Sequence, residues 1–135
     1  MVDSVFTKII KREFSADILY EDDICIVIFD IAPLRNGHCL VIPKMQVENF
    51  IGLENHVFNH VMNVSKGISK KLHDLLDVKR VIMLIEGFEV PHVHIHLIPS
   101  NTPLKLGETN PIQDYKSFMN GTGKLLIHEF RSFEI

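Results

Sequence analysis

Several features of extracellular, membrane-spanning and nucleic-acid-binding proteins are absent from this sequence. Its two cysteines, Cys25 and Cys39, form no Cys-x-x-Cys pair, which argues against a zinc knuckle or a redox motif. Both lie in apolar segments, where a buried free thiol in a reducing compartment is the simplest interpretation. The first 14 residues lack the apolar stretch of a secretory signal, and no apolar run approaches the roughly 20 residues that span a bilayer.

The chain also lacks an excess of positive charge. It has 14 Lys and Arg against 17 Asp and Glu, which gives a net charge of −3. Non-specific nucleic-acid binding depends on neutralising phosphates and is therefore not expected, and neither is a membrane partner. We expect a cytoplasmic protein, with the nucleus as the other option in a eukaryote. A hydrophobic content of 46% in 135 residues is typical of one globular domain, here residues 1–135.

The apolar pattern predicts an α+β domain with about five antiparallel strands, a short N-terminal helix and one long helix. Ser4 can cap the N-terminal helix. Apolar residues three and four apart from Val57 to Leu75 predict the long helix, in which Gly67 is expected to pack closely against another backbone. In the loop 30–37, Asn36-Gly37 tolerates positive φ. Strands are expected at residues 18–20, 24–29, 38–42, 80–85 and 92–97.

The C-terminal residues give a weaker pattern. Residues 101–123 are polar and rich in turn formers, and residues 124–130 suggest one more strand. Gly121-Thr122-Gly123-Lys124 resembles the end of a phosphate-binding P-loop. However, Phe118 occupies the first glycine position and Leu125 replaces the magnesium-binding Ser or Thr, so we interpret the run as a turn.

Three histidines at alternate positions, His92, His94 and His96, are the strongest chemical signal in the chain. In a β-strand alternate side chains share a face, so the three imidazoles are expected in one row, with Val93, Ile95 and Leu97 packed on the opposite face. Neutral imidazole is a good nucleophile near pH 7. The middle ring reaches both neighbours, which favours His94 as nucleophile with His92 and His96 as helpers.

A metal site is the competing interpretation of the histidine row. At about 3.3 Å per residue the Cα atoms of His92 and His96 lie roughly 13 Å apart, so three rings on one ion would be strained. Two adjacent rings and a distant ligand could still hold zinc. We therefore expect no required metal or cofactor, with opportunistic zinc binding at His92, His94 and His96 as the other option.

With these residues in place, the chain resembles the histidine triad (HIT) superfamily, whose signature is His-φ-His-φ-His-φ-φ with φ apolar. The resemblance covers roughly residues 4–100, and it makes residues 101–135 a C-terminal extension. Further family-like segments occur in the usual order: Val5-Phe6-Thr7-Lys8-Ile9-Ile10, Tyr20-Glu21-Asp22-Asp23, Phe29-Asp30-Ile31-Ala32-Pro33, and Gly37-His38-Cys39-Leu40-Val41-Ile42-Pro43-Lys44.

The resemblance implies nucleotide hydrolysis through a covalent nucleotidyl-histidine on His94. It implies that His96 faces the scissile bond, that His92 supports the triad, and that His38 joins this network. It also implies that the Asp30 carboxylate accepts hydrogen bonds from ribose hydroxyls, although a turn-capping role is the other interpretation of Asp30. Apolar residues matching the base pocket, which could equally be ordinary core, are Val5, Phe6, Ile9, Ile28, Phe29 and Ile31.

Departures from the family pattern affect substrate choice. The loop before the triad is short and lacks the asparagine and polar phosphate contacts of many members, and Glu89 puts a carboxylate near the expected anion. A bacterial-type subgroup of the family shares this Glu-Val-Pro-His form. Gln46 stands where many members carry a second histidine. The metal-binding cysteines that some members have near the N-terminus are absent, and Thr7 and its neighbours supply no ligand. A triad ending in His96 rather than glutamine favours hydrolysis over transfer.

The predicted function is that of a metal-independent hydrolase, and the resemblance implies a homodimer in which two such sheets join. The expected substrates are purine nucleoside phosphoramidates, nucleotidylated amines or dinucleoside polyphosphates. The alternative is a weakly active or inactive nucleotide-binding, sensing or scaffold protein of the same fold. A metal protein using His92, His94 and an outside ligand is a third interpretation.

Overall fold

The protein is an antiparallel sheet with helices on both faces, seen in a computed structural model that describes residues 1–105, 107–108 and 110–134. The five strands lie in the order β1-β2-β3-β5-β4, and every neighbouring pair is antiparallel. This confirms the predicted sheet. The strands are β1 (Ile18–Glu21), β2 (Cys25–Phe29), β3 (Cys39–Pro43), β4 (Arg80–Ile85) and β5 (Ile95–Ser100).

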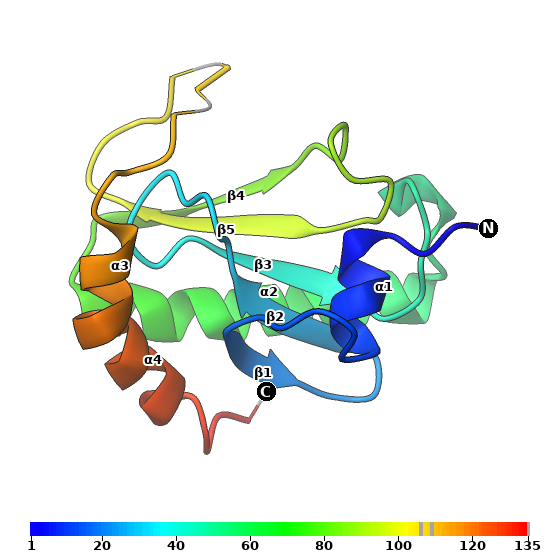
Figure 1. Cartoon of the computed structure of the whole chain (residues 1–135), viewed down its shortest axis with the longest axis horizontal. Coiled ribbons are helices and arrows are strands. Elements are labelled where there is room, and N and C mark those ends of the chain that lie inside the picture. The colour runs from blue at the N-terminus through cyan, green and yellow to red at the C-terminus, as the bar shows by residue number, and fades with distance from the viewer. Residues whose placement is uncertain (106, 109, 135) are drawn as a thin grey trace.

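Alternation along the strands divides the apolar residues between two clusters. One cluster includes residues of the long helix α2 (Asn55–Leu76) and the other includes residues of the short helix α1 (Val5–Ile10). These two helices lie on opposite faces of the sheet (Figure 1). Successive β-strand side chains point to opposite faces, so β2 and β3 serve both clusters. The α2 cluster includes Cys25, Val27, Phe29, Cys39 and Val41, and the α1 cluster includes Phe6, Ile9, Ile26, Ile28, Leu40 and Ile42.

Both predicted helices are present. Ser4 caps α1, because its Oγ accepts a hydrogen bond from the Thr7 backbone N–H at 3.0 Å. Helix α2 follows a 3₁₀ turn, η1 (Phe50–Gly52), and ends at Asp77 in the left-handed region with φ 51°. The buried apolar stripe of α2 consists of Val57, Val61, Val64, Ile68 and Leu72, which is the spacing that predicted the helix. Leu75, the last residue of the predicted stripe, is 43% exposed instead.

The histidine segment is only partly a strand. Strand β5 begins at Ile95, so His92 and His94 precede it, in contrast to the predicted strand at 92–97. The backbone N–H of Val93 donates to the carbonyl of Val47 at 2.8 Å, so a loop rather than β3 or β4 pairs with this stretch. Alternation nevertheless holds, because Val93 and Ile95 both join the α2 cluster.

Residues 115–129 of the C-terminal extension are helical, and the predicted strand at 124–130 is wrong. They form α3 (Tyr115–Phe118), the π-helical turn η2 (Met119–Gly123) and α4 (Lys124–Glu129), so the Gly121–Lys124 run is also helical. Leu126 and Phe130 are 2% exposed and complete the α2 cluster, a tertiary contact that overrides local pattern. A Cβ at Gly67 would lie 2.9 Å from Cζ of Phe133, so Gly67 packs on this ring rather than on a backbone.

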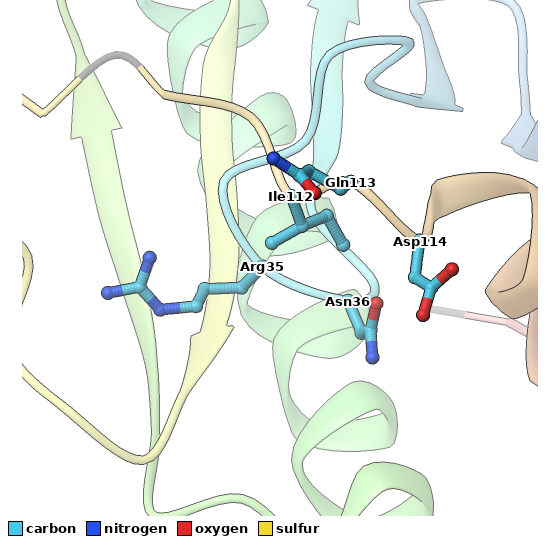
Figure 2. Close-up of a pocket in the computed structure, with 5 residues that line it drawn as sticks. All are labelled: Arg35, Asn36, Ile112, Gln113 and Asp114. Atoms are coloured by element: carbon cyan, nitrogen blue, oxygen red, sulfur yellow. The ribbon is translucent and has the colours of Figure 1, made fainter.

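The loop between β2 and β3 contacts the C-terminal extension. The Ile112 backbone N–H donates to the Pro33 carbonyl at 2.8 Å, and Arg35 pairs with Glu108 at 2.5 Å. Gly37 has the predicted positive φ, 87°, and a Cβ there would lie 2.7 Å from Cδ1 of Leu76. Between these segments lies a hollow of about 500 Å³, drawn in Figure 2 and lined by Arg35, Asn36, Ile112, Gln113 and Asp114.

None of the described helices combines the length and apolarity needed to cross a membrane.

Candidate functional site

The triad histidines lie on the α1 face of the sheet. The ring centroids of His94 and His96 are 5.0 Å apart, and the Phe6 ring on α1 meets those of His92 and His94 edge-on at 5.7 and 4.9 Å. His96 sits opposite Leu40 of β3, so the row continues the apolar α1 cluster. His92 is 0% and His94 6% exposed, whereas the His96 side chain is 20% exposed. The accessible end of the row is therefore at His96.

His38 joins the row, as the resemblance implies. Its Nε2 lies 2.9 Å from Nδ1 of His96 and 3.4 Å from Oδ2 of Asp30. Its Nδ1 accepts from the backbone N–H of Leu34 at 3.0 Å. Because that backbone group can only donate, the neutral His38 ring carries its proton on Nε2 and donates it to Nδ1 of His96. His96 then carries its own proton on Nε2.

Backbone carbonyls fix the other two rings in the same way. Nδ1 of His94 lies 2.7 Å from the His92 carbonyl, and Nε2 of His92 lies 2.7 Å from the Pro43 carbonyl. A carbonyl can only accept, so both of these nitrogens are N–H donors. The neutral His94 ring therefore keeps a lone pair on Nε2, which is the form needed for nucleophilic attack.

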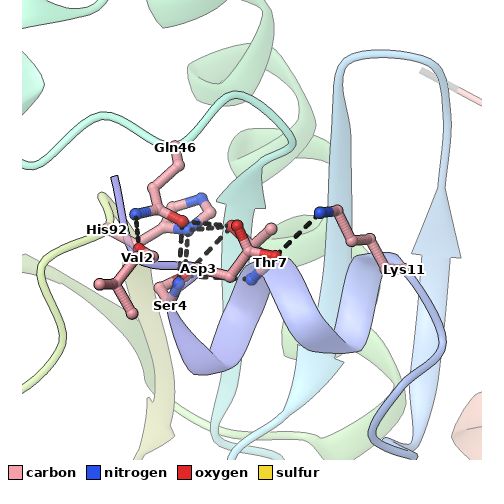
Figure 3. A network of polar contacts seen from close by, with 7 residues as sticks. All are labelled: Val2, Asp3, Ser4, Thr7, Lys11, Gln46 and His92. Atoms are coloured by element: carbon pink, nitrogen blue, oxygen red, sulfur yellow. Dashed lines mark hydrogen bonds and ion pairs between the residues drawn. The ribbon is translucent and has the colours of Figure 1, made fainter.

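A polar network connects α1 to His92 (Figure 3). Ser4 Oγ lies 2.7 Å from Nδ1 of His92, and Thr7 Oγ1 donates to Oε1 of Gln46 at 2.6 Å. Sequence reasoning assigned Ser4 only a capping role and treated Thr7 and Gln46 only as departures from the family pattern. No signal in the sequence links Ser4 to Gln46 and His92, because these contacts join residues 42 and 88 positions apart.

Burial favours the neutral form of three site histidines, His38, His92 and His96. It lowers the pKa of His38 to about 4, an effect that the nearby Asp30 carboxylate opposes. Burial also lowers the pKa of His92 and of His96 below the ordinary value of 6.5. At neutral pH these three rings are therefore neutral, with one ring proton each, and the tautomers described above are the relevant forms.

Asp30 makes the turn-capping interaction considered for it, and ribose binding by its carboxylate stays a prediction. Its Oδ1 accepts from the Ala32 backbone N–H at 2.8 Å, which is the turn-capping interaction, while Oδ2 faces His38 and lies 4.0 Å from Nδ1 of His96. The Asp30 side chain is 17% exposed, so it marks the accessible end of the site together with His96.

The predicted base-pocket residues separate into three groups. Phe6, Ile9 and Ile28 are buried together in the α1 cluster near the histidines. Val5 and Ile31 are exposed, at 40% and 83%. Phe29 belongs to the α2 cluster instead and meets Phe118 edge-on at 6.2 Å, because alternation along β2 turns it away from Ile28 and the histidines. The structure therefore does not bring Phe29 to the site.

The loop between β4 and β5 brings further carboxylates to His96. Burial lowers the pKa of His96 and neighbouring His94 adds to this, whereas the charges of Asp30, Glu86 and Glu89 raise it. Glu86, Phe88 and Glu89 are exposed, with Phe88 at 90%. The mouth of the site is consequently acidic, and it is distinct from the hollow around Arg35.

Two groups of side chains within the described residues have ligand atoms close enough for a metal ion: Asp22, Cys25 and His60, and Asp30, His38 and His96. Neither is poised for one. Nε2 of His38 carries a proton, and Asp22 already accepts from Tyr20, the backbone and His60. In the histidine row, both nitrogens of His92 are hydrogen-bonded. Zinc binding by the row stays a prediction, and these hydrogen bonds argue against it.

Comparison with known proteins identifies the family. Residues 11–102 match the HIT domain model, and this chain belongs to the HIT domain family. It is 32% identical over 102 residues to the purine nucleoside phosphoramidase of Escherichia coli K12, covering 71% of this chain and 86% of that protein. An uncharacterized HIT-like protein of Borreliella burgdorferi is 35% identical over 106 residues, which cover 73% of this chain and 76% of that protein.

Solved structures agree with the sequence comparison. A Zn-bound histidine triad family protein from Mycobacterium smegmatis superimposes with a TM-score of 0.77 and 25% identity, covering 93% of this chain and 91% of that chain. The resemblance to the HIT superfamily and the predicted fold are therefore confirmed.

Proposed function

We propose that the protein is a metal-independent nucleotide hydrolase that cleaves at the α-phosphate through a covalent intermediate on His94. The carrying observation is the hydrogen bond from Nδ1 of His94 to the His92 carbonyl, which leaves the Nε2 lone pair available for attack. The family membership and the phosphoramidase relative support this reading.

The rings divide the two chemical steps. Nε2 of His94 attacks the α-phosphorus, and the bond from phosphorus to the leaving nitrogen or oxygen breaks. The leaving atom accepts a hydrogen bond from Nε2–H of His96 and takes a proton from a water molecule at the accessible end, which becomes hydroxide. In the second step the hydroxide oxygen, oriented by His96, attacks phosphorus. The phosphorus–nitrogen bond to His94 then breaks, releasing the nucleoside monophosphate and restoring the His94 ring.

Among the expected substrates, we favour amine leaving groups, as in purine nucleoside phosphoramidates and nucleotidylated amines. A polyphosphate leaving group would approach His96 past the carboxylates of Glu86 and Glu89, which repel it. An amine leaving group suffers no such repulsion. The Escherichia coli relative is a purine nucleoside phosphoramidase, which agrees with this choice.

Nucleotide binding is assigned to the accessible end of the row. The Asp30 carboxylate, 17% exposed, accepts from the ribose hydroxyls, and the purine lies against exposed Val5 and Ile31. Phe6, Ile9 and Ile28 back this surface as packed core.

Intact-mass analysis tests the function. Adenosine phosphoramidate is incubated with wild-type protein and with His96→Ala, and the mass of one bound AMP is sought in the variant, where breakdown of the intermediate is slowed. Turnover by wild type, an adduct in His96→Ala and no adduct in the His94→Ala/His96→Ala double variant support the hydrolase. AMP binding without turnover or adduct favours the nucleotide-binding scaffold. Loss of activity on chelation favours the metal protein.

We also propose that the protein is a homodimer joined through β4. This strand lies at the edge of the sheet and exposes Met83 and Leu84 at 41% and 38%. An edge strand with apolar residues is a ready surface for antiparallel pairing with a second copy. Sedimentation of wild type as a dimer and of Leu84→Lys as a monomer supports this arrangement, and a monomeric wild type contradicts it.

A further inference from the structure

Ser4 is placed to act on the histidine row as well as on the helix that it caps. We propose that Ser4 is a positioning residue, whose hydroxyl donates to Nδ1 of His92 and so fixes the tautomer and orientation of that ring. Through His92 it also orients His94. The tautomer is a property of the folded protein alone, whereas the effect on turnover rests on the function proposed above.

The Ser4 hydroxyl has one proton, and its surroundings direct that proton to His92. Its oxygen already accepts from the Thr7 backbone N–H at 3.0 Å. Nδ1 of His92 lies at 2.7 Å, while Oγ1 of Thr7, the competing acceptor, lies at 3.3 Å. The shorter contact is to His92, and Ser4 is itself only 7% exposed, so water does not compete freely for the proton.

Gln46 holds the donor in place from the other side. Its Oε1 accepts from the Ser4 backbone N–H at 2.9 Å and from the Thr7 hydroxyl at 2.6 Å, and its Nε2 donates to the Val2 carbonyl at 2.9 Å. The Thr7 proton is therefore committed to Gln46. These bonds, drawn in Figure 3, fix the N-terminus of α1 against the loop that follows β3.

The second nitrogen of His92 makes the tautomer unambiguous. Nε2 donates to the Pro43 carbonyl at 2.7 Å, so Nδ1 must accept from Ser4 when the ring is neutral. Without the Ser4 hydroxyl, this fully buried nitrogen would keep only the 3.4 Å contact with Oγ1 of Thr7, whose proton is held by Gln46, and this favours a rotated ring or a protonated one.

His94 depends on the same anchor. Its Nδ1–H donates to the His92 carbonyl at 2.7 Å, and the Phe6 ring of α1 packs edge-on against both histidines. Ser4 therefore bonds the ring of His92 and His94 bonds the backbone carbonyl of the same residue, so that His92 links the start of α1 to the proposed nucleophile. A small displacement of His92 moves the lone pair on Nε2 of His94 out of line with phosphorus.

The first experiment determines the tautomer of the His92 ring in the absence of substrate. Nitrogen-15 chemical shifts of the ring of His92 are measured in wild type, Ser4→Ala and Ser4→Thr across a pH series. We expect an Nε2–H ring in wild type and Ser4→Thr, and in Ser4→Ala a second ring form or a raised pKa. An Nδ1–H ring in wild type, or unchanged shifts in Ser4→Ala, overturns the proposal.

The second experiment reads kcat and KM for adenosine phosphoramidate. Ser4→Ala is expected to lower kcat about tenfold with little change in KM, and Ser4→Thr to restore it, because loss of a supporting hydrogen bond typically costs about that much. Ser65→Ala removes another buried hydroxyl, which bonds the Val61 carbonyl within α2, and should leave kcat unchanged. Ser4→Gly replaces Ser4→Ala if the latter does not fold, since glycine is tolerated as a cap.

Failure of the positioning role is distinguishable from failure of the hydrolase. If wild type does not hydrolyse the substrate, the proposed function fails and the ring shifts still decide the role of Ser4. If wild type is active and Ser4→Ala or Ser4→Gly matches it in kcat, the positioning role is overturned. An equal loss of kcat in Ser65→Ala also overturns it, because the effect would then follow stability alone.

Discussion

The two faces of the sheet use the same strands for different purposes. The face toward α2 is apolar, from Cys25 and Val41 of the strands to Leu72 of the helix, and the C-terminal extension covers its end. The face toward α1 combines an apolar cluster with the four histidines. Within the described residues no buried side-chain N or O atom lacks a hydrogen-bond partner. Alternation along a strand therefore lets one face supply packing while the other holds a buried polar array.

Removing the proposed nucleophile should give the largest loss of turnover and should not disturb the apolar face of the sheet toward α2. We expect His94→Ala to lower kcat at least about a thousandfold, which corresponds to about 4 kcal/mol in the activation barrier. AMP affinity should stay within about tenfold, because binding is assigned to Asp30 and the exposed apolar surface. Steady-state kinetics and calorimetric titration with AMP measure the two quantities. His60→Ala, a histidine paired with Asp22 away from the row, is the control. Unchanged turnover in His94→Ala would refute the assigned nucleophile.

A substitution on the sheet face toward α2 should lower the free energy of unfolding and leave kcat nearly unchanged. Leu72 is 0% exposed in the α2 cluster, so Leu72→Ala should lower the free energy of unfolding by about 2–5 kcal/mol through lost burial and a cavity. Denaturant titration measures this, and kcat of the folded protein should remain near that of wild type. Leu75, on the same helix and 43% exposed, provides the matched control, since Leu75→Ala should cost far less. A large loss of kcat in Leu72→Ala would mean that the two faces are not independent.

The sequence was informative where one local pattern determined the structure. The stripe from Val57 to Leu75 predicted α2, and the cap at Ser4 predicted α1. It was less informative where distant contacts decide. The helices at 115–129 form because Leu126 and Phe130 find the α2 cluster, which local composition does not reveal. For the site, alternation predicted that the histidines share a face, but the bonds from Ser4 and Pro43 to His92 join residues far apart in the chain.

Lowering the pH should destabilise the sheet face toward α1, which holds the histidines, before it affects the apolar face toward α2. Burial lowers the pKa of His38 to about 4 from the ordinary 6.5, so the unfolded chain binds more protons than the folded one between these values. Stability is therefore full above about pH 6.5 and falls as the pH drops through this window, by about 2 kcal/mol between pH 7 and pH 5. Denaturant titrations across that range measure the slope. His38→Gln, which has no titrating ring at that position, should show a shallower dependence, and an identical slope in both proteins would contradict the assignment.

The smallest expected effect concerns charge at the mouth of the site. Glu89 is exposed and acts on His96 from the loop before β5, so Glu89→Gln removes one of the carboxylates that a departing polyphosphate would meet. We expect the ratio of kcat/KM for a dinucleoside polyphosphate to that for a phosphoramidate to rise about threefold, because a single solvent-exposed charge interaction is worth less than about 1 kcal/mol. The rise should shrink as salt is added, since screening weakens exposed charges. Glu129→Gln, an exposed carboxylate on α4, is the matched control and should leave the ratio unchanged. An equal change in both variants would indicate that net charge, rather than the position of Glu89 at the mouth of the site, sets the preference between the two substrates.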